Sequence, residues 1–185
     1  MKVYYFTPYA QDKKLGTAYN QSCEIVPDDN DWICIRDGDT MFLNFDWGHI
    51  VLNAITSYSH IYSAFTCYAS RIGGVAQQYG NIISEDPDIL NHRDIALKNA
   101  QLNSRKVKDI SCTPYISGHF MLFPKWLWNK VKFLEETEQG TFLGIDNYFF
   151  AHVRMNGYKI GLIEDLYLLH YYRLREGKNC KDHLI

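Results

Sequence analysis

The run Trp32–Arg36 has the length and composition of a buried β-strand, and it ends at two carboxylates, Asp37 and Asp39. In an extended backbone, residues i and i+2 point to the same side, so both carboxylates can face one point just beyond the strand. Hard divalent cations such as Mg²⁺ bind through one or two carboxylates together with phosphate oxygens of a substrate. The stretch therefore predicts a metal-bound diphosphate at a strand end.

The same residues also fit a simpler interpretation. Gly38 lies between the two aspartates, and Asp-Gly between apolar runs is one of the strongest short signals for a β-hairpin. On this motif alone a plain turn is favoured, because short motifs often match by chance. The rest of the chain has to decide between the turn and the metal site.

Strand-like and helix-like segments alternate along the chain. The strand-like segments are short, apolar and rich in β-branched and aromatic residues, and they lie at 3–7, 32–36, 61–68, 115–123, 158–163 and 166–170. The helix-like segments repeat apolar residues at helical spacing, and they lie at 13–25, 47–57, 87–103, 125–130 and 146–156. This alternation predicts an α/β fold, a Rossmann-like three-layer sandwich with a mostly parallel central sheet.

Three local features add to this expectation. Asp46 is expected to cap the helix 47–57, and Gly157 is expected to end the helix 146–156. Residues 69–85 are rich in glycine and polar side chains, so we expect a long loop there. In a compact domain such a loop is either functional or disordered.

Composition limits the classes of function. A chain of 185 residues suffices for a single domain, 1–185, with a core of its own. The formal net charge of −2 argues against a nucleic-acid partner, which would require a basic surface. An anionic nucleotide can still bind through a metal ion.

The five cysteines are odd in number, widely spaced and never in a Cys-x-x-Cys pair, so we expect neither a disulfide framework nor a zinc site. No run approaches the roughly 18 apolar residues of a transmembrane helix. The apolar run at the N-terminus is too short for a signal peptide. We therefore expect a cytoplasmic protein with no transmembrane segment.

Two more residues are candidates for chemistry. Ligands of open α/β sheets bind beyond the carboxyl ends of strands, where Asp37 and Asp39 are expected. In the second half, Asp146 opens a predicted helix and His170 follows the apolar run 167–169. Taken singly, an aspartate at a helix start is more often an N-cap, and a histidine among apolar residues is more often a hydrogen-bonded core residue.

Taken together, these features resemble family 2 type, GT-A-fold glycosyltransferases. That pattern comprises a strand ending in a DxD motif, a glycine-containing acceptor strand, an acidic pair opening a helix, a Gly-Tyr turn into a strand and a late histidine. The run Gly118–Phe123 with Trp126 and residues 133–135 is similar to the acceptor strand and helix, and 16–20 to the segment before the DxD strand. The resemblance covers most of the chain.

The resemblance implies a metal site that binds Mn²⁺ or Mg²⁺. Asp39 is expected to be the direct metal ligand, and Asp37 to contact the ribose or to reach the metal through water. His170 is expected to complete the metal and diphosphate site. Asp146 corresponds to the catalytic base, although the partner position holds Ile145 in place of glutamate.

The resemblance also implies residues that contact substrates. Gly118 and His119 are expected on the acceptor side, and the nucleotide is expected at the residues that follow the first predicted strand and on the first predicted helix, namely Pro8, Tyr9, Tyr19 and Asn20. The family usually has a further helix and strand after the first strand, with an aspartate that reads the base. The chain has only a few residues between Tyr9 and Gly16, so that aspartate has no counterpart.

The sequence thus predicts a glycosyltransferase that moves a sugar from a nucleotide-diphosphate-sugar donor to a saccharide or other hydroxyl acceptor, with metal dependence and inversion. One alternative is a non-catalytic, GT-A-like module that binds sugar or nucleotide. The other is a phosphohydrolase of the haloacid dehalogenase type, which also has two aspartates one residue apart. That family, however, has Thr or Val where this chain has Met41, and its motif ends the first strand.

Overall fold

The computed structural model describes residues 1–81, 86–135 and 144–171. Its β-strands are β1 (Val3–Phe6), β2 (Trp32–Arg36), β3 (Thr40–Phe42), β4 (Ala64–Ala69), β5 (Val107–Asp109), β6 (Phe120–Pro124) and β7 (Ile160–His170). Its α-helices are α1 (Leu15–Glu24), α2 (Trp47–Tyr58), α3 (Ile89–Asn103), α4 (Lys125–Val131) and α5 (Ile145–Met155). Two short 3₁₀ turns, η1 (Val75–Gln77) and η2 (Tyr79–Asn81), lie in the segment between β4 and α3.

All seven strands belong to one sheet with the order β1-β2-β6-β4-β7-β3, and β5 also pairs with β7. Among the strands of the described residues, only β1 with β2 and β4 with β7 pair in parallel, and the other strand pairs are antiparallel. The expectation of a mostly parallel sheet is therefore wrong, because the sheet is mixed. A parallel connection needs a crossover, usually a helix. The chain instead passes from β5 to β6 through the irregular residues 110–119, and β6 enters antiparallel between β2 and β4.

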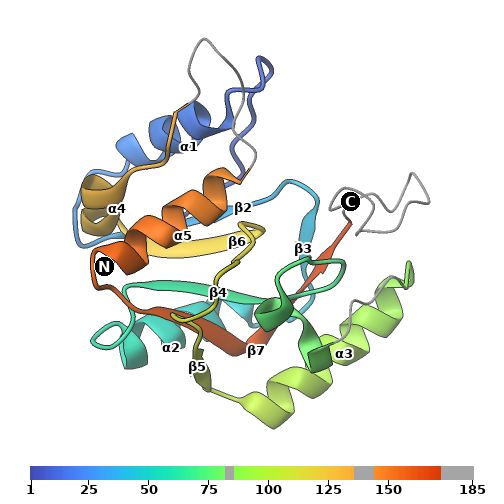
Figure 1. The fold of residues 1–185 in the computed structure, drawn as a ribbon. Helices are drawn as coiled ribbons and strands as arrows, with labels where there is room; N and C mark the ends of the chain where they lie inside the picture. Colours follow the sequence, from blue (N-terminus) through green and yellow to red (C-terminus); the bar gives the residue numbers. More distant parts are fainter. Residues whose placement is uncertain (82–85, 136–143, 172–185) are drawn as a thin grey trace.

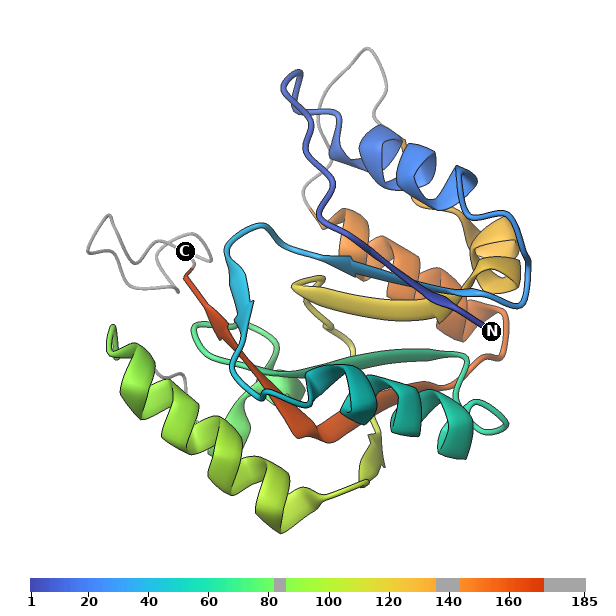
Figure 2. The same ribbon diagram turned by 180° about the vertical axis from the view of Figure 1, so that it is seen from behind.

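Helices cover both faces of this sheet, which confirms the α/β expectation (Figure 1). Successive residues of a strand point to opposite faces, and the buried strands are apolar on both. Ile33 and Met121 belong to the core that faces α1, α4 and α5, whereas Cys34 and Leu122 belong to the core that faces α2. Figure 2 shows the sheet from behind, with α2 along the second face and α3 beside β7.

β7 is a single strand of 11 residues where the sequence indicated two segments. Its register against β4 shifts, since Cys67 pairs with Ile163 but Tyr68 pairs with Tyr167. The extra residues form a bulge, and the backbone oxygen of Glu164 accepts a hydrogen bond of 2.6 Å from Asn99 of α3. The strand therefore continues through Glu164 and Asp165 and ends at His170.

The other differences from the expected elements are small. The three-residue strands β3 and β5 were not expected, because runs of this length carry no measurable periodicity. β6 begins at Phe120, later than the predicted strand 115–123. Asp46 is the N-cap residue of α2, but its side chain makes no capping hydrogen bond, so that part of the expectation is wrong.

Within the described residues, no helix has both the length and the apolar character needed to cross a membrane. This agrees with the expectation of no transmembrane segment for that part of the chain.

Gly161 of β7 lies at a closely packed position of the sheet, and a substitution there tests this packing. A Cβ atom there would lie 2.6 Å from Val107 Cγ1 and 2.9 Å from the ring of Phe65. We predict that Gly161→Ala lowers the free energy of unfolding by about 1–3 kcal/mol, as overpacking of a core does. Urea denaturation followed by circular dichroism measures this change.

The matched control is Gly48→Ala in α2, where an added Cβ would meet nothing within 4 Å. Alanine is favoured over glycine in a helix by up to about 1 kcal/mol, so this variant should be more stable than the wild type. Equal effects of the two substitutions would contradict the packing described for β7.

Candidate metal centre

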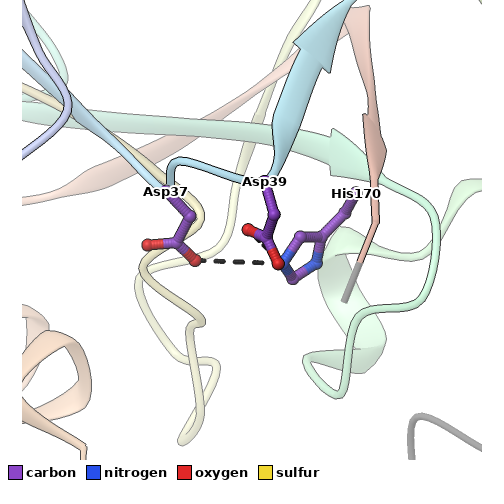
Figure 3. Close-up of side chains that lie close together, drawn as sticks. All are labelled: Asp37, Asp39 and His170. Carbon is purple, nitrogen blue, oxygen red and sulfur yellow. Dashed lines mark ion pairs between the residues drawn. The ribbon is translucent and has the colours of Figure 1, made fainter. Parts of the chain in front are cut away.

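Asp37, Asp39 and His170 lie together at one end of the sheet (Figure 3). His170 Nε2 is 3.4 Å from Asp39 Oδ1 and 3.9 Å from Asp37 Oδ2. One ligand atom from each of the three residues lies within 4.8 Å of the other two. The structure thus brings together the three residues that the sequence analysis predicted as metal ligands.

The turn between β2 and β3 holds the two aspartates. The backbone oxygen of Asp37 accepts hydrogen bonds from Thr40, at 3.3 Å from the amide and 2.7 Å from the hydroxyl. Arg36 fixes the turn from the strand side, because its guanidinium donates to the backbone oxygen of Thr40 at 2.8 Å. A turn is therefore present, as the simpler interpretation predicted.

The hairpin implied by that interpretation is nevertheless wrong. β2 pairs with β1 and β6, whereas β3 pairs with β7. The turn therefore carries the chain from β2 to the far side of β7 and leaves the aspartate side chains beside the end of β7 (Figure 3).

Backbone pairing places His170 at this turn. Thr40 is its partner in the β3–β7 ladder, and the next amide, of Tyr171, donates to the backbone oxygen of Asp39 at 2.8 Å. On the other side, the His170 amide donates to the Ser70 hydroxyl at 2.9 Å. The side chain of His170 is only 7 % exposed, as a core histidine would be, but its Nε2 faces the two carboxylates.

The pKa values of the two aspartates are shifted in opposite directions. Burial raises the pKa of Asp37 to about 6; His170 opposes this shift, and the neighbouring Asp39 and Asp146 add to it. Burial also raises the pKa of Asp39, but the hydrogen bond and charge of His170 outweigh it, so this pKa lies below its ordinary value. Without a cation, the cluster therefore contains one carboxyl that resists ionisation.

His119 lies behind the cluster. Its ring is stacked on that of His170 with centroids 6.1 Å apart, and its backbone oxygen accepts a hydrogen bond of 3.2 Å from the Asp37 amide. Burial lowers the pKa of His119 to about 3, so the ring is neutral, and its Nε2 lies 3.8 Å from the sulfur of Cys67. His119, expected on the acceptor side, thus supports the predicted ligands from within the core.

Asp146 lies at the start of α5, but it does not cap that helix. The N-cap residue is Gly144, whose φ of 87° suits glycine. Asp146 Oδ2 instead accepts a hydrogen bond of 2.6 Å from the amide of Gly118. A Cβ at position 118 would lie 2.5 Å from Asp146 Cβ, so this close approach requires glycine.

Two consecutive residues connect Asp146 to the metal cluster. Gly118 binds the carboxylate of Asp146, and His119 binds the backbone of Asp37. Burial raises the pKa of Asp146, with the amides of Asn147 and Gly118 opposing this shift. The charge of Asp146 in turn raises the pKa of Asp37, as expected for two carboxylates in one site.

Pro8 and Tyr9 follow β1, which ends beside the turn between β2 and β3. A Cβ on Gly38 would lie 3.4 Å from Thr7 Cγ2, so these segments are in contact. Tyr9 is 84 % exposed, which leaves its ring available to a ligand. Pro8 and Tyr9 thus directly follow a residue that lies against the acidic turn, and their predicted contact with a nucleoside stays a prediction.

Tyr19 and Asn20 are buried residues of α1, and their side chains lie in the core between this helix and α4. Tyr19 packs edge-on against Phe133, with centroids 5.0 Å apart. The Asn20 amide donates to Phe133 O and accepts from both Phe133 N and the indole of Trp128, at 2.9–3.0 Å. It also donates to Glu135 Oε1 at 2.9 Å. Because these bonds use the whole bonding capacity of the amide, the structure gives Asn20 a structural function and no group for a nucleotide.

The carboxylates of Asp37 and Asp146 nevertheless affect the pKa of Tyr19. Burial raises its pKa first, and these two carboxylates raise it further. The ring is therefore a core residue whose edge lies near the site.

Two residues that sequence reasoning missed hold the site from the segment between β4 and η2. The Ser70 hydroxyl binds the backbone of His170, and the buried carboxamide of Gln77 binds the backbone of Ser117. No sequence signal separates these residues from other polar residues of a loop. The expected loop 69–85 contains η1 and η2, and residues 82–85 lie outside the described ranges.

The donors suit a divalent cation. Carboxylates suit Mg²⁺ and Mn²⁺, and an imidazole adds affinity for later transition metals such as Fe, Ni, Cu and Zn. Two metal–ligand bonds of about 2.1 Å at a right angle span about 3 Å, close to the 3.4 Å between His170 Nε2 and Asp39 Oδ1. The residues present therefore fit the predicted metal.

No protein-family model matches the chain, and no curated protein matches it.

The opposite pKa shifts of the two aspartates predict opposite effects on stability in metal-free buffer. Asp37 has a raised pKa in the folded state, so stability is lost as pH rises from about 4 to about 6, between the ordinary and the folded values. Asp37→Asn removes this loss and should stabilise the protein at pH 7. The side chain is 37 % exposed, so solvent screening limits the gain to roughly 1 kcal/mol.

Asp39→Asn should act in the other direction, because the lowered pKa of Asp39 stabilises the fold at neutral pH. Denaturant titrations with a chelator at pH 4 and pH 7 measure both variants. The same sign for both at pH 7 would contradict the electrostatics described above.

The structural function of Asn20 predicts a loss of stability on truncation. Asn20→Ala leaves the buried indole of Trp128 and the amide of Phe133 without their acceptor. An unsatisfied buried donor costs about 1–3 kcal/mol, so we expect a decrease of about 2–4 kcal/mol. Asn129→Ala is the control, since Asn129 makes an exposed hydrogen bond to Asp29. An Asn20→Ala variant as stable as this control would overturn the assignment.

Proposed function

We propose that this protein is a metal-dependent glycosyltransferase with a GT-A-like fold, which moves a sugar from a nucleotide-diphosphate-sugar donor to an acceptor hydroxyl. The observation that carries the proposal is the convergence of Asp37, Asp39 and His170, with Asp146 joined to them through Gly118 and His119. The mixed sheet with helices on both faces is compatible with this proposal.

Asp39 and His170 are the direct ligands of the proposed Mn²⁺ or Mg²⁺, and Asp37 binds the metal or the donor ribose. These residues would hold a divalent cation there, which would supply Lewis-acid stabilisation of the negative charge on the leaving diphosphate. The turn and the β3–β7 ladder fix these side chains through the backbone. In this proposal the donor's nucleoside binds at Pro8 and Tyr9, which follow Thr7.

Asp146 is the proposed general base. Its carboxylate takes the proton of the acceptor hydroxyl as the oxygen attacks the anomeric carbon, and the bond from that carbon to the phosphate oxygen breaks on the opposite side. This in-line displacement inverts the anomeric centre. Burial raises the pKa of Asp146, which makes the carboxylate a better base. The Gly118 amide binds Oδ2 at 2.6 Å, whereas Oδ1 accepts a longer hydrogen bond of 3.5 Å from Asn147 Nδ2, so Oδ1 is the oxygen proposed to face the acceptor.

The proposal is tested with a panel of nucleotide-diphosphate sugars and Mn²⁺. Thermal unfolding with nucleoside diphosphates identifies the nucleotide, because a ligand that binds the native state raises its melting temperature. We expect Asp39→Ala to abolish the metal-dependent shift. Asp146→Asn should keep that shift and lower kcat by about 10²- to 10⁴-fold, the usual contribution of a general base.

Asp165→Asn is the matched control for the base. Asp165 is a buried aspartate that, like Asp146, accepts a backbone amide, that of Arg105 at 2.6 Å, but it lies at the bulge of β7. This variant should lose stability and keep its activity. Nucleotide-sugar binding without turnover would support the non-catalytic module, and a beryllofluoride adduct on Asp37 would support the phosphohydrolase; either result would overturn the proposal.

A further inference from the structure

The segment Ser117–His119 is the connection between the two halves of the candidate site. Its middle residue, Gly118, donates to the carboxylate of Asp146, and its last residue, His119, accepts from the amide of Asp37. Consecutive Cα atoms are about 3.8 Å apart, so a small movement of this segment changes the position of Asp146 relative to the metal cluster. The segment precedes β6 and is not itself part of a strand.

Gln77 holds this segment from the side. Its Oε1 accepts from Ser117 N at 2.8 Å, and its Nε2 donates to Ser117 O at 2.9 Å. The carboxamide thus binds both polar groups of one residue's backbone, as a neighbouring strand would. Nε2 also donates to the hydroxyl of Thr66 in β4 at 2.8 Å. The sheet thereby fixes the carboxamide, which in turn fixes Ser117.

This arrangement is buried and fully bonded. Gln77 and Thr66 are 0 % exposed, so water does not replace the hydrogen bonds when one partner is removed. A side chain at position 74 would collide with Gln77 Oε1. Glycine before η1 therefore leaves the space that the carboxamide occupies. A long, flexible glutamine loses rotamer freedom when it is fixed in this way, and the bonds to Ser117 offset that cost.

We propose that Gln77 is a positioning residue, whose carboxamide fixes the Ser117–His119 segment and so sets Asp146 relative to the metal cluster. It touches none of the predicted ligands or the base directly. This inference rests on the proposed function for its effect on turnover. Its structural part, the placement of Gly118 against Asp146, stands without that function.

The first test compares Gln77→Met with Gln78→Met in the full chain. Gln78 is a matched control because it is also buried, but its amide donates to Ile72 O at 2.9 Å within its own loop. Gln77→Met should lower kcat by about 10-fold or more, since misplacement by 1 Å can cost about 10²-fold. Its metal-dependent affinity for the nucleoside diphosphate should change by less than about 3-fold, because the β3–β7 ladder holds the ligands.

Gln78→Met should keep kcat within about 3-fold of the wild type, whatever its stability. Equal losses of kcat in the two variants, or full activity of Gln77→Met, would overturn the inference. The acidic limb of the kcat–pH profile should also move in Gln77→Met and not in Gln78→Met, because the Gly118 amide no longer holds the base. A purely structural defect would leave this limb unchanged.

Thr66→Val provides a milder variant in case Gln77→Met does not fold. It removes one partner of the carboxamide and keeps the shape of the side chain. We expect a smaller loss of kcat in the same direction, and no loss would count against the inference.

The amide proton of Gly118 gives a readout that does not require turnover. In the wild type its NMR shift should follow the titration of Asp146, since the two groups share a hydrogen bond of 2.6 Å. In Gln77→Met this dependence should be lost, while Gln78→Met keeps it. If the wild type transfers no sugar, the proposed function fails, and this measurement alone decides the placement of Asp146 by Gln77.

Discussion

The pairing of β3 with β7 is the interaction on which the candidate site depends. Three residues of β3 pair with the last three of β7, and Thr40 lies opposite His170. In a simple hairpin, β3 would pair with β2. The β3–β7 ladder instead brings the residues after β2 to the far edge of the sheet, beside β7. Backbone hydrogen bonds fix strand positions independently of side-chain identity, so the ladder places an imidazole from the end of the chain against two carboxylates from its beginning.

The cluster gathers like charges before any cation is bound. Burial raises the pKa of Asp37 most, and the charges of Asp39 and Asp146 raise it further. The fold tolerates this because backbone contacts hold each residue, such as the amide of Gly118 on Asp146 and the β-turn around Asp37. Functional sites commonly hold perturbed groups of this kind at a cost in stability. The electrostatics therefore favour a cation at this end of the sheet.

Buried amide side chains act here as parts of the backbone network. Gln77 pairs with Ser117, and Asn20 joins α1 to the residues after α4. Within the described part of the chain, the irregular segments at Ser117 and Phe133 have no neighbouring strand to bond to at these positions. The two side chains provide the missing partners, so the buried backbone groups of these segments are satisfied. This explains why a loop rich in polar residues packs against the sheet and supports the site. It also explains why a predicted nucleotide contact, Asn20, has a structural function.

Much of the fold follows from local patterns. The apolar run Trp32–Arg36 and the periodic helices are close to the observed elements, because burial on both faces of a sheet or on one face of a helix leaves a direct trace in the sequence. The short strands β3 and β5 left no such trace. The sequence indicated two strands, 158–163 and 166–170, and the structure instead has a bulge within one strand.

The sequence by itself determined which residues can do chemistry: the couplet of Asp37 and Asp39, the aspartate at the start of α5 and the late histidine. Residue type and local spacing suffice for that, because ligand chemistry belongs to the side chain. Only the tertiary structure decided that Asp37, Asp39 and His170 meet, that Asp146 bonds to Gly118, that the sheet is mixed, and that Gln77 and Ser70 hold their neighbours in place. Strand order and pairing between distant segments are set by packing across the whole sheet, which no local pattern encodes.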